Sequence, residues 1–180
     1  MKAVYTIFIF AIIAAGCSKP PADDYMKKAR EAEKSGLWSV AIENYQLLAK
    51  DHPENPLAQT ALFSIAAIQQ NGLQNSQAAI DGYKSYLDKY PDGEKAATAL
   101  FLTGFLYHNE LKNLDSAKVF YQRFLAKYPQ HEMAASAQFE LQNLGKSPDE
   151  ILPKPVVAET TPEKSATKSA TKSAKPSKKN

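Results

Sequence analysis

Three stretches of the sequence end in the same way at a fixed interval of 38 residues, and this repeat constrains the fold more than any other feature. Residues 79–91 and 117–129 are identical at six of thirteen positions. The residues that recur in all three stretches are Ala41, Ala79 and Ala117; Tyr45, Tyr83 and Tyr121; and Pro53, Pro91 and Pro129. A period of this length with a small residue, an aromatic residue and then a proline is typical of stacked helical hairpins. The sequence therefore predicts an all-α, right-handed solenoid.

Residues that break helices divide the repeat into hairpins. Gly36 is expected to end a first helix that begins near Asp23 or Asp24, whose carboxylates suit the exposed N–H groups of a helix start. Since proline cannot continue a helix, each proline of the repeat is expected to end the second helix of its hairpin. The predicted helices span about 23–35, 39–51, 56–70, 77–90, 94–110 and 115–128, forming hairpins over 23–53, 56–91 and 94–129, and a capping helix at about 132–144 closes the stack.

Small side chains are expected where the two helices of a hairpin approach closely. Ala66 and Gly104 supply them on first helices, and the alanines of the repeat supply them on second helices. The tyrosine one turn later fills the groove beside that contact, and burying it stabilises the fold by about 2–3 kcal/mol. A single hairpin cannot bury its own apolar face, so each hairpin needs its neighbours.

These residues resemble the signature of tetratricopeptide repeats (TPR), and the resemblance covers residues 23–144. The third repeat has signature residues at Leu100, Gly104, Tyr107, Ala117, Tyr121 and Pro129. The second repeat differs at Gln69, where an aromatic residue is usual. The ending at residues 124–129 is similar to that of periplasmic repeat proteins of the BamD and CpoB kinds. The resemblance implies a protein that binds other proteins.

In TPR stacks the first helix of each hairpin lines an inner face that holds a peptide. The resemblance therefore implies a groove that binds a protein or peptide partner. Its expected residues are Met26, Arg30, Phe63, Ala67, Gln70, Asn71, Phe101, Phe105, His108 and Asn109. Phe63 and Phe101 could equally pack on the adjacent hairpin as core. Phe105, His108 and Asn109 are expected to face the groove.

The N-terminus resembles the signal peptide of a bacterial lipoprotein. Lys2 is followed by an uncharged, mostly apolar run over residues 3–15, which is too short to span a membrane comfortably. Two small residues then precede Cys17, the only cysteine in the chain. The resemblance implies cleavage after residue 16, lipid on Cys17, a short tether over 17–22 and a place at the outer membrane facing the periplasm. The alternative is an ordinary secretory signal that leaves an idle thiol.

The C-terminal segment differs from the rest of the chain in charge and composition. Residues 18–144 contain 13 Lys and Arg against 15 Asp and Glu, whereas residues 145–180 contain 8 Lys against 4 acids. The basic balance therefore belongs to the tail, and nothing indicates a nucleic-acid-binding domain. The tail lacks the apolar residues needed for a core, so we expect it to be disordered. Its six lysines over residues 164–180 could bind an anionic surface or simply keep the chain soluble.

Residues suited to catalysis or metal binding are scattered. The three histidines, His52, His108 and His131, lie in different predicted elements, and the chain has no Walker loop, nucleophile elbow or dinucleotide-binding motif. The sequence therefore predicts no enzyme activity, metal, cofactor or small-molecule substrate. The leading hypothesis is a lipid-anchored periplasmic scaffold that helps to assemble an envelope complex, such as the one that assembles outer-membrane proteins. The alternative is a structural tether that uses the basic tail, with the repeats as a spacer.

Overall fold

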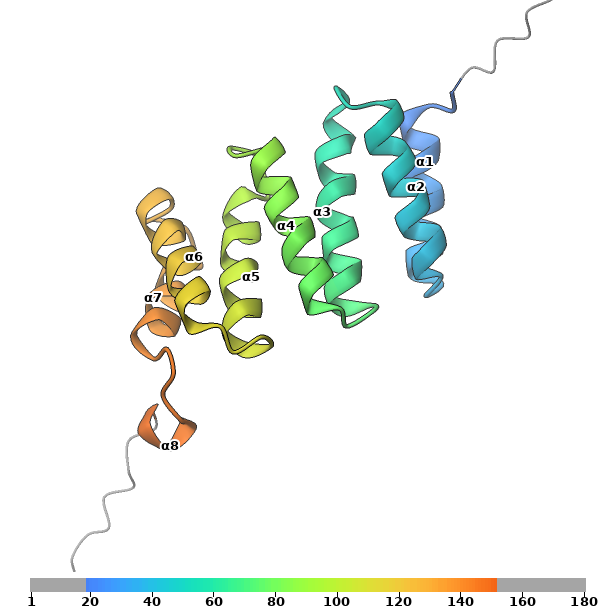
Figure 1. Ribbon diagram of the computed structural model, residues 1–180. Coiled ribbons are helices and arrows are strands. Elements are labelled where there is room, and N and C mark those ends of the chain that lie inside the picture. The colour runs from blue at the N-terminus through green and yellow to red at the C-terminus, as the bar shows by residue number, and fades with distance from the viewer. Residues whose placement is uncertain (1–18, 152–180) are drawn as a thin grey trace, which may run out of the picture. The chain divides into compact units, whose positions relative to one another are not determined.

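The computed structural model describes residues 19–151, and within them it contains eight helices and no strand (Figure 1). The helices are α1 (Ala22–Lys34), α2 (Trp38–Asp51), α3 (Pro56–Asn71), α4 (Ser76–Lys89), α5 (Ala96–Asn109), α6 (Leu114–Lys127), α7 (Ala134–Gln142) and α8 (Pro148–Ile151). The chain forms two units, and α1 to α7 belong to the first, which ends at Lys146. Cys17 and its signal peptide lie outside the described residues.

Helices α1 to α7 form three hairpins and one further helix, arranged side by side in chain order (Figure 1). The turns within the hairpins lie along the lower edge in Figure 1, and the loops between hairpins lie along the upper edge. Each helix packs mainly on the helices before and after it, and α1 also contacts α3. The predicted all-α solenoid is therefore confirmed, and the C-terminal ends of the three first helices lie together at the turn edge.

Helix ends follow the expected chemistry at most positions. Gly36 has a φ of +70°, and Leu37 beyond it donates its N–H to the carbonyl of Ala32, which closes the end of α1. Asn75 and Asn113, which are 38 residues apart, accept backbone N–H groups at the starts of α4 and α6. The start of α1 differs from the prediction. Pro21 is its N-cap without a side-chain bond, and the expected capping acids lie within the first turn, where the helix dipole favours them.

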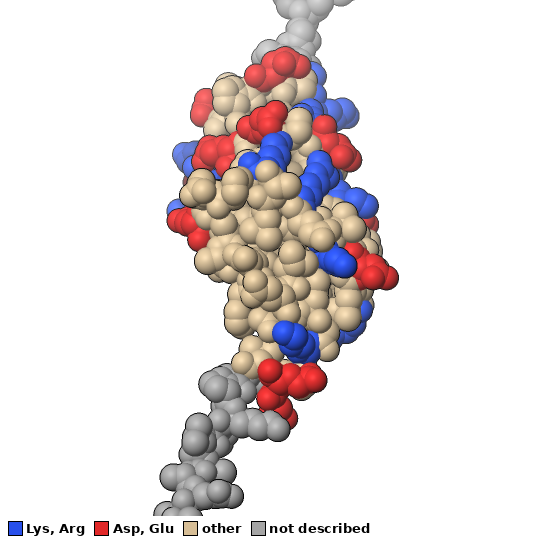
Figure 2. Space-filling model, turned by 90° about the vertical axis from the view of Figure 1, so that its left-hand side faces the viewer, with Lys and Arg blue, Asp and Glu red and all other residues tan. Residues whose placement is uncertain are grey.

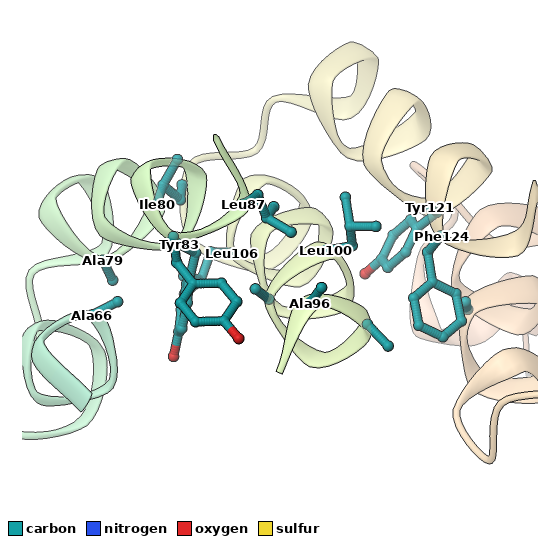
Figure 3. Packing of buried hydrophobic residues seen from close by; sticks show 14 of the residues in the cluster. Ala66, Ala79, Ile80, Tyr83, Leu87, Ala96, Leu100, Leu106, Tyr121 and Phe124 are labelled. Carbon is teal, nitrogen blue, oxygen red and sulfur yellow. The ribbon is translucent and has the colours of Figure 1, made fainter. Parts of the chain in front are cut away.

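The close helix contacts predicted from the small residues are present. Ala66 on α3 and Ala79 on α4 are both fully buried and point toward one another in Figure 3. A Cβ atom added to Gly82 would lie 2.8 Å from the Cβ atom of Ala66, so α3 and α4 touch almost backbone to backbone. Gly104 similarly leaves room for Tyr121, since an added Cβ atom would lie 3.0 Å from that ring.

Helix α7 ends the stack because its outward residues depart from the repeat. Ala137 keeps the buried position of the repeat and is fully buried. Gln138 and Gln142 follow Leu100 and Gly104 by 38 residues, and both glutamines are exposed. A glutamine in place of Gly104 leaves no space for another tyrosine-bearing helix. Few charged side chains cover the middle of this end of the stack in Figure 2, although polar glutamines contribute to it.

The tail predicted to be disordered contains one short described element. Helix α8 is a single turn in which Ser147 donates its backbone N–H to Glu150 at 2.7 Å, so the serine side of the turn is capped. Nothing else of residues 152–180 lies within the described part of the chain.

Candidate functional site: two adjoining pockets on the first helices

Two pockets lie where the C-terminal ends of α1, α3 and α5 meet the hairpin turns. The first, here called the tryptophan pocket, has a volume of about 510 Å³. It is lined by Arg30, Glu33, Lys34, Trp38, Ala67, Ile68, Asn71 and Gly72. The second, here called the amide pocket, has a volume of about 440 Å³. It is lined by Gln70, Asn71, Gln74, Ser76, Phe105, Leu106 and Glu110. Asn71 belongs to both pockets, so they adjoin.

The wall of the tryptophan pocket depends on a close contact at a hairpin turn. Trp38, the only tryptophan in the chain, begins α2 and lies against Gly72 at the end of α3. A Cβ atom added to Gly72 would lie 2.8 Å from the indole ring, so only glycine lets the ring sit this close. The indole, Ala67 and Ile68 make this pocket mainly apolar.

The charged groups of the tryptophan pocket are unequally engaged. Glu33 accepts a hydrogen bond from the hydroxyl of Tyr45 at 2.8 Å. Burial, together with this bond, raises the pKa of Tyr45 to about 12. Arg30 and Lys34 are exposed and form no ion pair with any residue of the range 19–151. The pocket therefore offers two cations, whereas its carboxylate is already bound.

The amide pocket is mainly polar. Asn71, Gln74 and Ser76 surround it, and Phe105 and Leu106 supply its apolar side. Gln74 has a φ of +51°, a left-handed conformation that lets the chain turn back sharply after α3. Amides can both donate to and accept from the backbone of a bound segment. This arrangement suits an extended peptide.

Several predicted groove residues are brought together here. Gln70, Asn71 and Phe105 line the amide pocket, and Arg30 and Ala67 line the tryptophan pocket. Gln70 also accepts a hydrogen bond from the hydroxyl of Tyr83 at 2.9 Å, so part of its bonding capacity is used inside the hairpin. Their role in binding stays a prediction.

Three predicted groove residues are placed elsewhere. Met26 is only 4% exposed and belongs to the core around α1 and α2. His108 lies with its Nδ1 3.1 Å from Oε2 of Glu140, so it packs against α7 and does not face the groove freely. The side-chain amide of Asn109 donates to the carbonyl of Phe105 in its own helix.

Phe63 and Phe101 pack as core residues, but on their own hairpins. The Phe63 ring lies 5.2 Å from that of Tyr83 and 5.7 Å from that of Tyr86, measured between centroids. Phe101 makes the equivalent contacts with Tyr121 and Phe124 at 5.8 and 6.0 Å. Both phenylalanines are half-buried. Of the two interpretations, the structure favours packing within the fold.

Sequence reasoning missed part of both pockets. Trp38 stands where the next two repeats have Ser76 and Leu114, so its departure from the repeat is the signal that could have identified it. Lys34 was missed because the first hairpin turn is one residue shorter than the second, which shifts the register of α1. Glu110 and Gln74 lie in turns, where the repeat carries little information.

Other classes of site find no support in the described chain. Residues 19–151 contain no group of three metal-ligating side chains. No helix in this range is long and apolar enough to cross a membrane.

Comparison with known proteins agrees with the fold. The family model described as tetratricopeptide repeat matches residues 60–93 and 98–131. No curated protein matches the chain. The first hairpin, α1 and α2, lies outside the matched residues but packs on α3 in the same stack. The chain therefore contains tetratricopeptide repeats between residues 60 and 131, the type of repeat that mediates contacts between proteins.

Proposed function

We propose that this protein is a lipid-anchored scaffold of the bacterial envelope that holds an extended segment of a partner protein along α1, α3 and α5. The observation that carries the proposal is the continuity of the two pockets through Asn71. A segment lying across both pockets would contact all three hairpins at once, because the pockets are lined by their first helices.

The lining of the pockets supports peptide binding. Phe105 and Trp38 are aromatic side chains of the kind that anchor interfaces, and amides stand between them. An extended peptide exposes unpaired backbone N–H and carbonyl groups, and Asn71 and Gln74 can bond both types. The site thus combines apolar anchors with groups that recognise a backbone of any sequence.

The envelope location rests on the N-terminal sequence. A short apolar segment followed by small residues and Cys17 supports export and lipid attachment. The similarity of residues 124–129 to BamD and CpoB proteins supports a place at the outer membrane and a role in assembling envelope proteins. Acyl chains on Cys17 would keep the repeats at the membrane surface, where such clients emerge.

Site-specific photo-crosslinking in intact cells tests the scaffold. A photoreactive residue at Asn71, which is exposed and shared by the pockets, is expected to capture a partner. The matched control is Lys84, which is exposed on α4 and lines neither pocket. Mass spectrometry then identifies the captured protein. Equal capture at both positions, or none at Asn71, would count against the groove.

The tether is a second candidate, supported by the six lysines of residues 164–180. Removing residues 152–180 distinguishes the two. A tether would lose its attachment to anionic vesicles or envelopes, whereas a scaffold would keep its crosslinks at Asn71.

A further inference from the structure

We infer that the tryptophan pocket selects an acidic, apolar segment of the partner: an apolar side chain enters beside Trp38, and a neighbouring side-chain carboxylate pairs with Arg30 or Lys34. This inference rests on the proposed function and adds the chemistry of the bound segment. It also fixes which end of the groove the acidic part occupies.

The apolar half of the inference follows from the walls. The pocket has the volume of a ligand site and is closed on one side by the Trp38 indole, which Gly72 admits at close range. A second, smaller hollow of about 290 Å³ lies on the turn side of Trp38 and includes Leu37, Val40 and Leu73. These three side chains are 44–55% exposed. Apolar surface therefore continues around the indole, which favours an apolar partner residue there.

The acidic half follows from the charges at the rim. Arg30 and Lys34 are one helical turn apart, so their side chains start about 6 Å from each other on one face of α1. Neither has an ion partner among residues 19–151, and Glu33, the only acid of this pocket, is bound by Tyr45. Unpaired cations beside an apolar hollow fit a carboxylate next to an apolar residue.

The carboxylate is assigned to a side chain and not to a chain end. Asn71 connects the tryptophan pocket to the amide pocket, so a bound segment has a path onward from α1 to α5. The amide pocket contains Glu110 and no Lys or Arg. The preference for acid is thus restricted to the α1 end, which gives the bound segment a direction.

Tryptophan fluorescence gives a direct readout, because Trp38 is the only tryptophan and lines the pocket. The probes are short peptides in a Gly-Ser background, acetylated and amidated so that their ends are uncharged. One carries Glu-Leu-Glu, and the comparison peptides carry Lys-Leu-Lys, Gln-Leu-Gln and Glu-Gly-Glu. The Glu-Leu-Glu peptide is expected to change the emission and to bind about tenfold more tightly than Lys-Leu-Lys, with an affinity that falls as salt rises.

Charge reversal in the pocket provides the second arm. The R30E/K34E variant is expected to reverse the order of the Glu-Leu-Glu and Lys-Leu-Lys peptides. The K27E/K28E variant changes the net charge equally, on exposed residues of the same helix that line neither pocket, and should keep the original order. Far-UV circular dichroism of both variants confirms that α1 remains folded.

Three results would overturn the inference. They are equal binding of the acidic and basic peptides, the same reversal in K27E/K28E, and tighter binding of a Gln-Leu peptide with a free C-terminal carboxylate. The scaffold itself is judged separately. A partner captured at Asn71 through a basic segment would overturn the inference while keeping the scaffold, whereas acid-selective binding without any captured partner would overturn the scaffold alone.

Discussion

Exchanging Ala66 and Gly82 tests the close contact between α3 and α4. In Gly82→Ala, the new Cβ atom would lie 2.8 Å from the Cβ atom and 3.2 Å from the Cα atom of Ala66. Carbon atoms normally pack about 3.5–4.0 Å apart, and neither atom of Ala66 can rotate away. Overpacking of this kind costs about 2 kcal/mol, and the better helix propensity of alanine returns about 1 kcal/mol. The single variant should therefore be less stable by about 1 kcal/mol.

Ala66→Gly alone should cost about 1.8 kcal/mol, from about 1 kcal/mol of helix propensity and about 0.8 kcal/mol for the buried methyl group. If the two changes acted independently, the double variant would lose nearly 3 kcal/mol. In the exchanged pair, however, one methyl group still fills the contact from the other helix. The double variant should lie within about 1 kcal/mol of the original protein, which gives a coupling energy of about 2 kcal/mol.

The assay is urea unfolding followed by far-UV circular dichroism, on chains that start after Cys17. Ala78→Gly, at a half-buried position of α4, reports the cost of glycine in a helix without this contact. The argument fails if the effects of the two changes add within about 0.5 kcal/mol, since α3 and α4 would then not meet at these atoms.

Three further predictions concern pH, the groove and the anchor. Because the pKa of Tyr45 is raised from 10 to about 12, the folded chain keeps a proton that the unfolded chain loses, so stability is expected to fall as pH rises from 10 to 12. Urea midpoints of Tyr45→Phe should fall less steeply over this range, and an unchanged slope would contradict the assignment. Phe105→Ala should weaken partner capture about thirtyfold with little change in stability, whereas His108→Ala should lower the urea midpoint by releasing α7 and leave capture unchanged; the opposite pattern would move the binding face. Cys17→Ser should prevent incorporation of labelled fatty acid, and an unaltered protein that fractionates as soluble would disprove the anchor.

The fold could be predicted from the sequence because its information is local and repeated. A buried alanine, a buried tyrosine one turn later and a terminating proline specify a hairpin, and the 38-residue interval specifies that hairpins stack. The capping residues Asn75 and Asn113 keep the same interval, so the turns repeat along with the helices.

The site could be predicted only in part, because its residues lie where the repeat is broken. The shorter turn after α1 moves Lys34 into the position that Asn71 holds in the next hairpin. Trp38 has no counterpart in the other repeats. The error at His108 has a similar cause. Its partner Glu140 follows Leu102 by 38 residues, so no periodic signal marks α7 as the source of a carboxylate.

The tyrosine hydroxyls separate the structural residues of the inner face from those available to a partner. In the first two hairpins the buried tyrosine of the second helix donates to the equivalent residue of the first helix, from Tyr45 to Glu33 and from Tyr83 to Gln70. The third hairpin has His108 at this position. His108 is bonded to α7, and the hydroxyl of Tyr121 has no hydrogen-bond partner among the described residues.

One residue of each first helix is thus committed to the fold, whichever type of side chain it carries. The residues three positions earlier, Arg30, Ala67 and Phe105, make no such side-chain hydrogen bond within residues 19–151, and all three line the pockets. They also differ completely in chemistry: a cation, a methyl group and an aromatic ring. A stack whose framework position is fixed by tyrosine can therefore vary this neighbouring position freely, and the order from cation to ring gives the groove its direction.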